Sequence, residues 1–273
     1  MIESACHSAF KRTDCLGCHD GGHGSDNLKL LKKNAVDLCY GCHERKDKNK
    51  VPHSAVVVGD CAVCHDPHSS DQPKLVAKAP LQATCFVCHQ DDLTGRKVIH
   101  APVVKGCDQC HDAHGAQNRN ALKVGEGKAG CYKCHKPVDT GKNKHAALER
   151  YGCTGCHDPH GTDEPSMMGQ KVNVLCKGCH PSQDERHVTA LAPNGHPIGG
   201  NLVDPKRDGR GFTCASCHNP HGSDSPKLLR LGSTPMESCA WCHGDKGGSS
   251  GLKDVTHRAH RAPLPGTAPT GVG

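Results

Sequence analysis

Residues 61–68 read Cys-Ala-Val-Cys-His-Asp-Pro-His, and close copies of this stretch recur along a chain of 273 residues. The copy at residues 214–224 reads Cys-Ala-Ser-Cys-His-Asn-Pro-His-Gly-Ser-Asp. The shared element, Cys-x-x-Cys-His, occurs ten times and uses all but one of the 21 cysteines. Because internal repetition is the signature of a repeat architecture, this motif sets the organisation of the chain.

The motifs come in pairs. The distance between successive motif starts alternates between 24 and 22 residues over most of the chain, so the repeat is a pair of motifs about 46 residues long. A longer Pro- and Gly-rich insert, residues 181–213, precedes the last pair. We expect five units, each with a first and a second motif, and a flexible tail. Their expected boundaries are residues 1–52, 53–99, 100–144, 145–186, 187–243 and, for the tail, 244–273.

The composition argues against a conventional side-chain core. The chain has one Trp, three Tyr and three Phe, a hydrophobic fraction of 34%, 32 Gly and 18 Pro. So few large apolar side chains can hardly fill an interior. With 21 Cys and 23 His, the expected filler is a metal or a metal cofactor. Since neither helical nor strand periodicity persists, we expect mostly coil, with short α-helices at the motifs and little or no sheet.

The motif itself indicates the cofactor. Two cysteines separated by two residues can present both sulfurs on one side of a turn, which suits thioether bonds to the two vinyl groups of a haem. The next histidine then supplies the proximal iron ligand. The expected thioether residues are Cys15, Cys18, Cys39, Cys42, Cys61, Cys64, Cys85, Cys88, Cys107, Cys110, Cys131, Cys134, Cys153, Cys156, Cys176, Cys179, Cys214, Cys217, Cys239 and Cys242. The expected proximal ligands are His19, His43, His65, His89, His111, His135, His157, His180, His218 and His243.

Two other chemistries use paired cysteines. Zinc ribbons combine two Cys-x-x-Cys pairs into a four-cysteine site, and five units would then hold five zinc ions. Disulfides or a redox dithiol are the other alternative. Neither chemistry requires a histidine directly after the second cysteine of all ten motifs. We therefore predict ten covalently attached c-type haems.

At these motifs the chain resembles the multihaem c-type cytochromes with doubled CxxCH motifs, and the resemblance covers residues 7–243. It implies haems that lie close together in a chain and a fold with little regular structure. It also implies electron transfer in the periplasm, through the outer envelope or along extracellular filaments. The expected fold is therefore haem-templated, a linear array of five two-haem repeats.

Further histidines recur at fixed offsets. We call those behind the first motif of each unit the trailing histidines: His23, His68, His114, His160 and His221. Those seven or eight residues ahead of the first motif in four units are the leading histidines: His7, His53, His100 and His145. The insert holds His187 and His196, and the tail holds His257 and His260. Most first motifs continue into a Gly/Ser-Asp stretch and a Lys-Leu-Leu-like run, such as residues 226–229.

These 13 histidines are the candidate distal ligands. Ten haems need ten distal ligands, so we expect bis-histidine ligation throughout, with no need for the four methionines. A trailing histidine such as His68 follows its own proximal ligand by three residues, which is too little chain to reach the opposite face of that haem. We therefore expect it to ligate a neighbouring haem. The cofactors would crosslink the units, and the chain without haem should be unfolded.

The net charge, the aromatic content and the hydropathy limit the kinds of partner that we expect. The formal net charge is +6. Each ferric bis-histidine haem with ionised propionates contributes roughly −1, which brings the total to about −4 when oxidised and about −14 when reduced. With so few aromatics and no long basic run, we expect no nucleic-acid partner. The chain has no run of about 18 apolar residues, so we predict no transmembrane segment.

The expected location follows from the cofactor. The N-terminus lacks the basic start and apolar stretch of a secretory signal. Attachment of c-type haems is normally completed outside the cytoplasm. We therefore expect an exported protein on the extracellular or periplasmic side of the envelope, from which a leader has been removed.

The expected function is electron transport by haem-to-haem hopping, without enzymatic activity. A multihaem reductase needs an open iron position, whereas every motif here ends in His and distal histidines are in surplus. A periplasmic shuttle, a conduit in an outer-membrane barrel and an extracellular filament remain open. The expected partners are other redox proteins or an extracellular electron acceptor.

The chain ends raise two further points. A surplus terminal histidine, one of His7, His257 and His260, could ligate a haem of the next copy and build a head-to-tail polymer. Cys6 stands outside any motif, because Glu3 occupies the place of the first cysteine that it would need. We expect it to be a thiol beside His7, not a haem attachment.

Overall fold

The computed structural model describes residues 5–8, 14–22, 24–90, 93, 95–182, 198, 203–207, 209–230, 232 and 234–244. His23, His187, His196, His257 and His260 lie outside this part of the chain, as does the side chain of Cys6. The chain divides into an N-terminal part, Met1–Lys133, and a C-terminal part, Cys134–Gly273. The division falls inside the third expected unit.

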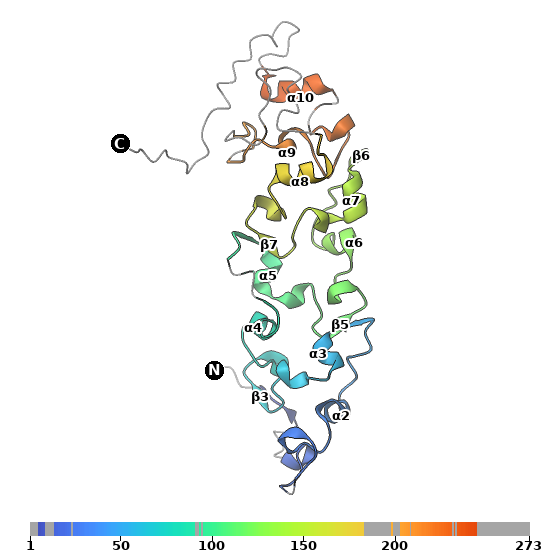
Figure 1. The fold of residues 1–273 in the computed structure, drawn as a ribbon, viewed down its shortest axis with the longest axis vertical. Helices are drawn as coiled ribbons and strands as arrows, with labels where there is room; N and C mark the ends of the chain where they lie inside the picture. The colour runs from blue at the N-terminus through green and yellow to red at the C-terminus, as the bar shows by residue number, and fades with distance from the viewer. Residues whose placement is uncertain are drawn as a thin grey trace, which may run out of the picture. The chain divides into compact units, whose positions relative to one another are not determined.

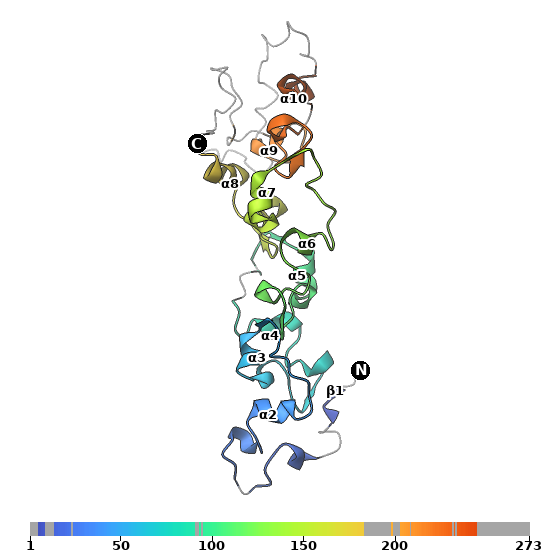
Figure 2. The same cartoon turned by 90° about the vertical axis from the view of Figure 1, so that its right-hand side faces the viewer.

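The fold is mostly coil with short helices and two-residue strands, as the composition predicts (Figures 1 and 2). The α-helices are α2 (Ala35–Tyr40), α3 (Ser54–Val57), α4 (Leu81–Cys85), α5 (Ala101–Lys105), α6 (Gly127–Cys131), α7 (Ala146–Tyr151), α8 (Val172–Cys179), α9 (Cys214–Cys217) and α10 (Pro235–Cys242). The strands are β1 (Ala5–Cys6), β2 (Val51–Pro52), β3 (Ser69–Ser70), β4 (Val98–Ile99), β5 (Gly115–Ala116), β6 (Asn143–Lys144), β7 (Gly161–Thr162) and β8 (Gly222–Ser223). In the described residues, no helix is long and apolar enough to cross a bilayer.

Single 3-10 turns complete the secondary structure. One set begins at the first cysteine of a first motif: Cys15–Gly17, Cys61–Val63, Cys107–Gln109 and Cys153–Gly155. A second set lies in the Lys-Leu-Leu-like runs: Leu28–Leu30, Pro73–Leu75, Arg119–Ala121, Pro165–Met167 and Pro226–Leu228. The second motifs instead lie at the ends of α2, α4, α6, α8 and α10.

Side-chain caps explain where several of these helices begin. The Asn34 side chain accepts a hydrogen bond from the backbone N–H of Asp37 at the start of α2. Thr234 and Glu237 form a reciprocal capping box at the start of α10. Such caps satisfy backbone N–H groups that have no partner inside the helix. The caps therefore define where these short helices begin.

The strands join consecutive units through residues that are distant in sequence. In the N-terminal part β1 pairs with β3 and β2 pairs with β5, both antiparallel. In the C-terminal part β6 pairs with β8 in the same way. Each pairing connects the strand ahead of a leading histidine to the strand behind a trailing histidine of the next unit. At Gly115 in β5, an added Cβ would lie 2.5 Å from the carbonyl oxygen of Val51, so only glycine fits this approach.

The described residues contain very little apolar core. The buried hydrophobic residues are Ala116, Leu148, Ile198 and Phe212, and no described side chain is less than 2% exposed. Large apolar residues such as Leu28, at 88% exposure, and Val58, at 72%, face outward. Because apolar burial is the main driving force for folding, the polypeptide alone has little to hold these loops in place.

Candidate metal-binding sites

Each first motif is a tight turn that gathers its functional side chains. In the second unit the backbone N–H groups of Cys64 and His65 both donate to the carbonyl oxygen of Cys61, at 3.2 and 3.0 Å. The N–H of the proximal histidine makes the same bond in the other four first motifs, to Cys15, Cys107, Cys153 and Cys214. The turn therefore holds two sulfurs and one imidazole together, which is the arrangement that haem attachment requires.

A backbone carbonyl accepts a hydrogen bond from the ring of each first-motif histidine and so fixes the orientation of the ring. Nδ1 of the ring lies 2.8–2.9 Å from a carbonyl oxygen in all five cases: His19 with Lys29, His65 with Lys74, His111 with Asn120, His157 with Ser166 and His218 with Lys227. A carbonyl oxygen can only accept a hydrogen bond, so the proton belongs on Nδ1. Nε2 is then the unprotonated nitrogen, available to a metal ion.

The accepting residues have an unusual backbone. Each carbonyl belongs to the first of two consecutive residues with positive φ, which we call a left-handed doublet: Lys29–Leu30, Lys74–Leu75, Asn120–Ala121, Ser166–Met167 and Lys227–Leu228. No other described non-glycine residue has a positive φ. Left-handed helical conformation costs roughly 1–2 kcal/mol per residue outside glycine. The Lys-Leu-Leu-like run is visible in the sequence, but its role is not, because residue propensities do not predict two consecutive positive φ angles.

The trailing histidines are positioned by a turn of their own. Asp66 Oδ1 accepts hydrogen bonds from the backbone N–H groups of His68 and Ser69. Asp112, Asp158 and Asn219 accept the same bond from His114, His160 and His221. Aspartate and asparagine side chains favour such local turns. The turn aims the imidazole away from the motif that precedes it.

The leading histidines stand directly before short helices. His53, His100 and His145 occupy the residue preceding α3, α5 and α7. Hydrogen bonds between backbones tie them to the trailing histidines, since the N–H of His7 donates to His68 at 3.0 Å and that of His53 to His114 at 3.3 Å. The strand pairs therefore bring a leading and a trailing histidine from consecutive units to the same place.

Within each part of the chain, described histidine rings face one another in pairs. In the N-terminal part the ring centroids of His7 and His43, His19 and His68, His53 and His89, and His65 and His114 lie 6.0–6.1 Å apart. In the C-terminal part the distances are 6.2 Å for His145 and His180 and 6.0 Å for His157 and His221. A metal–imidazole bond of about 2 Å on each side, with about 1 Å from each nitrogen to its ring centre, gives a separation of about 6 Å. The paired rings thus fit two axial ligands of one iron.

The pairs follow one rule. A first-motif histidine faces the trailing histidine of the next unit, as His19 faces His68. A second-motif histidine faces the leading histidine of its own unit, as His89 faces His53. His68 therefore lies opposite a neighbouring motif, in keeping with the short chain that separates it from His65. His7 faces His43 of its own chain, which removes it from the terminal histidines considered for ligation between copies.

No described histidine ring faces that of His218, the first-motif histidine of the last unit. His218 is otherwise like its counterparts, since its Nδ1 is bonded to Lys227. The histidines that sequence reasoning placed near it, His187, His196, His257 and His260, are all outside the described residues.

Cysteines of successive motifs also adjoin. The thiol of Cys39 is hydrogen-bonded to that of Cys61, and Cys85 is similarly bonded to Cys107. Burial, together with these neighbours, raises the pKa of Cys39 and of Cys85 to about 11. In the C-terminal part, the hydrogen bond between Cys176 and Cys214 raises the pKa of Cys176. The second motif of one unit and the first motif of the next therefore present their attachment points side by side.

No disulfide joins any two of the twenty motif cysteines. Within the described residues no three Cys, His, Asp or Glu side chains converge to form a site for a bare metal ion. The four-cysteine arrangement of a zinc ribbon is therefore not formed in this part of the chain. Paired imidazoles with thiols at their side fit a ligand that spans the gap between them, as a haem would.

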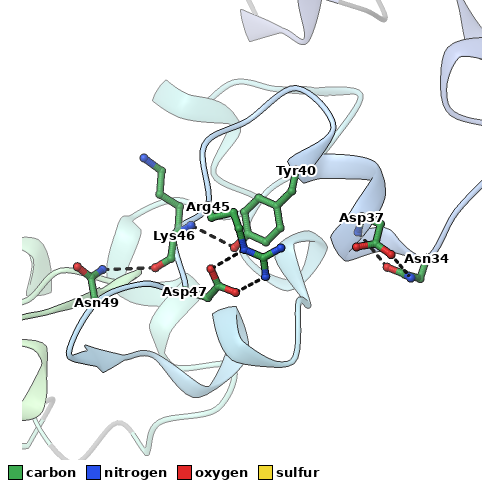
Figure 3. Close-up of polar contacts among 7 residues, drawn as sticks. All are labelled: Asn34, Asp37, Tyr40, Arg45, Lys46, Asp47 and Asn49. Carbon is green, nitrogen blue, oxygen red and sulfur yellow. Dashed lines mark hydrogen bonds and ion pairs between the residues drawn. The ribbon is translucent and has the colours of Figure 1, made fainter.

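A basic hollow adjoins one of the histidine pairs. Arg45, Lys46 and Lys48 line it together with His114. The loop is held by the ion pair of Arg45 with Asp47 and by the Arg45 guanidinium, which lies 4.6 Å from the centre of the Tyr40 ring (Figure 3). The same ion pair lowers the pKa of Asp47. Cationic side chains at this position suit anionic substituents such as haem propionates.

The comparisons agree with the repeats. The sequence matches the family model described as the doubled CXXCH motif five times, over residues 7–48, 53–94, 100–140, 145–185 and 205–248. No curated protein matches the chain. The five matches contain all ten motifs, and together they cover most of the chain.

Proposed function

We propose that this chain, which belongs to the doubled CXXCH family of multihaem c-type cytochromes, conducts electrons through ten bis-histidine sites. The family implies about ten covalently attached haems and a role in electron transfer. The bound haem supplies a one-electron ferric/ferrous couple. The protein provides the two cysteines that attach each haem and the histidines that occupy both axial positions. The observation that carries this proposal is the set of six imidazole pairs, 6.0–6.2 Å apart.

Two further observations support conduction. Adjoining thiols such as Cys39 and Cys61 would place the attached edges of successive cofactors next to each other, which shortens the path between them. Histidines on both sides of each iron leave no position for a substrate, which disfavours reductase chemistry. Basic residues around His114 would neutralise propionates.

The holoprotein should carry ten haems, all of them low-spin. Mass spectrometry should give the mass of the chain plus ten haems, because each motif supplies both thioether cysteines. Absorption spectra should not change on addition of CO or nitrite, since both axial positions are filled. A high-spin fraction that turns over nitrite or hydroxylamine would instead support the reductase alternative.

Replacement of a trailing histidine should damage the preceding unit. In His68→Ala we expect the haem at Cys15 and Cys18 to become high-spin, because His68 faces His19. The haem at Cys61 and Cys64 should keep its low-spin spectrum, since its expected distal ligand is His114. EPR and absorption spectra of the holoprotein measure the spin states.

The neighbouring change Ser69→Ala is the matched control, because Ser69 accompanies His68 in the same turn without facing a motif histidine. The control should leave all ten haems low-spin. If His68→Ala alters the haem at Cys61 and Cys64 instead, the pairing rule is wrong.

The same rule supports a head-to-tail polymer. A trailing histidine serves the first motif of the preceding unit, and within residues 1–273 no unit precedes that of His23. Within the same residues no unit follows that of His218 to supply its distal ligand. A second copy placed head to tail would provide His23 to His218, and would bring terminal haems of adjacent copies together. A filament outside the cell is the setting that such conduction suits best.

The two alternative settings would complete the last haem sites with different histidines. In a periplasmic shuttle or an outer-membrane conduit, His257, His260 or an insert histidine would complete the last sites within one copy. Haem attachment places the protein outside the cytoplasm in either case. The proposed partners are redox proteins or an extracellular acceptor at the ends of the haem chain, with copies of itself as the partner in a filament.

A further inference from the structure

The left-handed doublets divide the motif histidines into two classes. All five first-motif histidines donate Nδ1–H to a doublet carbonyl at 2.8–2.9 Å. For the second-motif histidines His43, His89 and His180, the described residues offer no hydrogen-bond acceptor to Nδ1. These three residues are exposed, so water is the partner that remains for them.

The ring planes show a related difference. The first-motif pairs are close to parallel, with interplanar angles of 18° for His19–His68, 1° for His65–His114 and 26° for His157–His221. Two of the second-motif pairs are crossed, at 56° for His7–His43 and 58° for His53–His89. The third, His145–His180, has an angle of 24°. A fixed carbonyl at Nδ1 restricts rotation of the ring about its bond to the metal, in keeping with the absence of crossed planes among these three first-motif pairs.

We propose that the left-handed doublets of the first, second and fourth units are positioning elements that lower the reduction potential of the first haem in each of these units relative to the second. The proposal rests on the bis-histidine ligation proposed above. A hydrogen bond from Nδ1–H to a carbonyl makes the imidazole a stronger electron donor. Stronger donation stabilises the ferric over the ferrous state and so lowers the potential. Potentials would alternate along the chain, with electrons resting on the second haems and passing across the first.

The strain at the doublets supports a role beyond turn formation. Pro, Lys and Leu recur in these runs, and no glycine occupies a doublet position. A glycine there would relieve the strain, whereas the non-glycine residues hold the same conformation in all five units. Backbone strain that recurs beside a site commonly serves that site. The product of this conformation is a carbonyl that points at the metal-binding histidine.

The first test uses the unchanged holoprotein. Parallel and crossed imidazole planes give distinct low-spin EPR signals, and a stepwise titration with dithionite follows each signal as its haems are reduced. We expect the crossed-plane signal to be lost while most of the parallel-plane signal remains. Loss of both signals together, or loss of the parallel-plane signal first, would overturn the proposal.

The second test alters one doublet. Lys74→Pro forces φ from +59° to about −65° and moves the carbonyl away from His65. We expect about one tenth of the haem absorbance to shift to higher potential, because one of ten haems loses its carbonyl. Lys74→Gly removes the same charge but accepts the positive φ, so its titration should match that of the unchanged protein.

The outcomes separate this proposal from the one it rests on. If the unchanged protein is high-spin, bis-histidine ligation fails. If it is wholly low-spin, with ten haems, and Lys74→Pro titrates like Lys74→Gly, only the role of the doublet fails. If Lys74→Pro does not bind ten haems, the dithionite titration of the unchanged protein, followed by EPR, tests the role of the doublet.

Discussion

Without its haems the chain is expected to be unfolded. The described residues bury only Ala116, Leu148, Ile198 and Phe212 among the hydrophobic residues, and the strands are two residues long. Fixing each backbone residue costs roughly 1–2 kcal/mol of conformational entropy, which so little apolar burial cannot offset. Attached haems would supply both the apolar filling and the crosslinks between units.

Circular dichroism and hydrogen exchange on the chain produced without haem attachment measure this. We expect loss of the helical signal and exchange of all amides at the rate of an unstructured peptide. The holoprotein in the same buffer is the reference. A cooperative thermal transition in the haem-free chain would show that the polypeptide has a core of its own.

A graded version of the experiment tests the crosslinks. The double variant Cys15→Ala, Cys18→Ala should lose one haem at the end of the chain. Because His68 faces His19 across that site, we expect faster exchange around residues 14–32 with little change in the third unit. Equal protection of the first unit with and without this haem would contradict a cofactor-held fold.

Loss of a single trailing histidine should also abolish polymers. In His23→Ala we expect electron microscopy to show isolated molecules, in place of the head-to-tail filaments that we propose for the unchanged protein. One haem in ten should become high-spin, and the pairing rule identifies it as the haem at Cys214 and Cys217. The reason is that His218 has no facing histidine among the described residues of its own chain.

The tail supplies the matched controls. His257→Ala and His260→Ala change the terminal histidines at the other end, and both should retain filaments and ten low-spin haems. If His23→Ala keeps all ten haems low-spin while a tail variant makes one high-spin, the last site is completed within one copy. The shuttle or the conduit then replaces the filament. Unchanged protein that stays monomeric at high concentration leads to the same conclusion.

The repeated motif was enough to predict the cofactor, its number and the family. Cysteine spacing and the following histidine are local properties, because haem attachment is set within five consecutive residues. The absence of a core could likewise be read from composition. That His68 must serve a neighbour also followed from sequence, since three residues of chain cannot cross a haem.

Tertiary structure decided which neighbour each histidine faces. The trailing histidine lies opposite the first motif of the preceding unit and not the second motif of its own, because β1–β3, β2–β5 and β6–β8 join residues that are distant in sequence. Pairs of two-residue strands leave no periodicity to detect. The hydrogen bond between His65 Nδ1–H and the Lys74 carbonyl could not be predicted either. Every residue has a backbone carbonyl, and the sequence does not show which one lies beside a histidine. The sequence by itself thus determined the motifs and the candidate ligands, whereas only the folded backbone, through long-range strand pairs and left-handed doublets, decided how these histidines are paired and oriented.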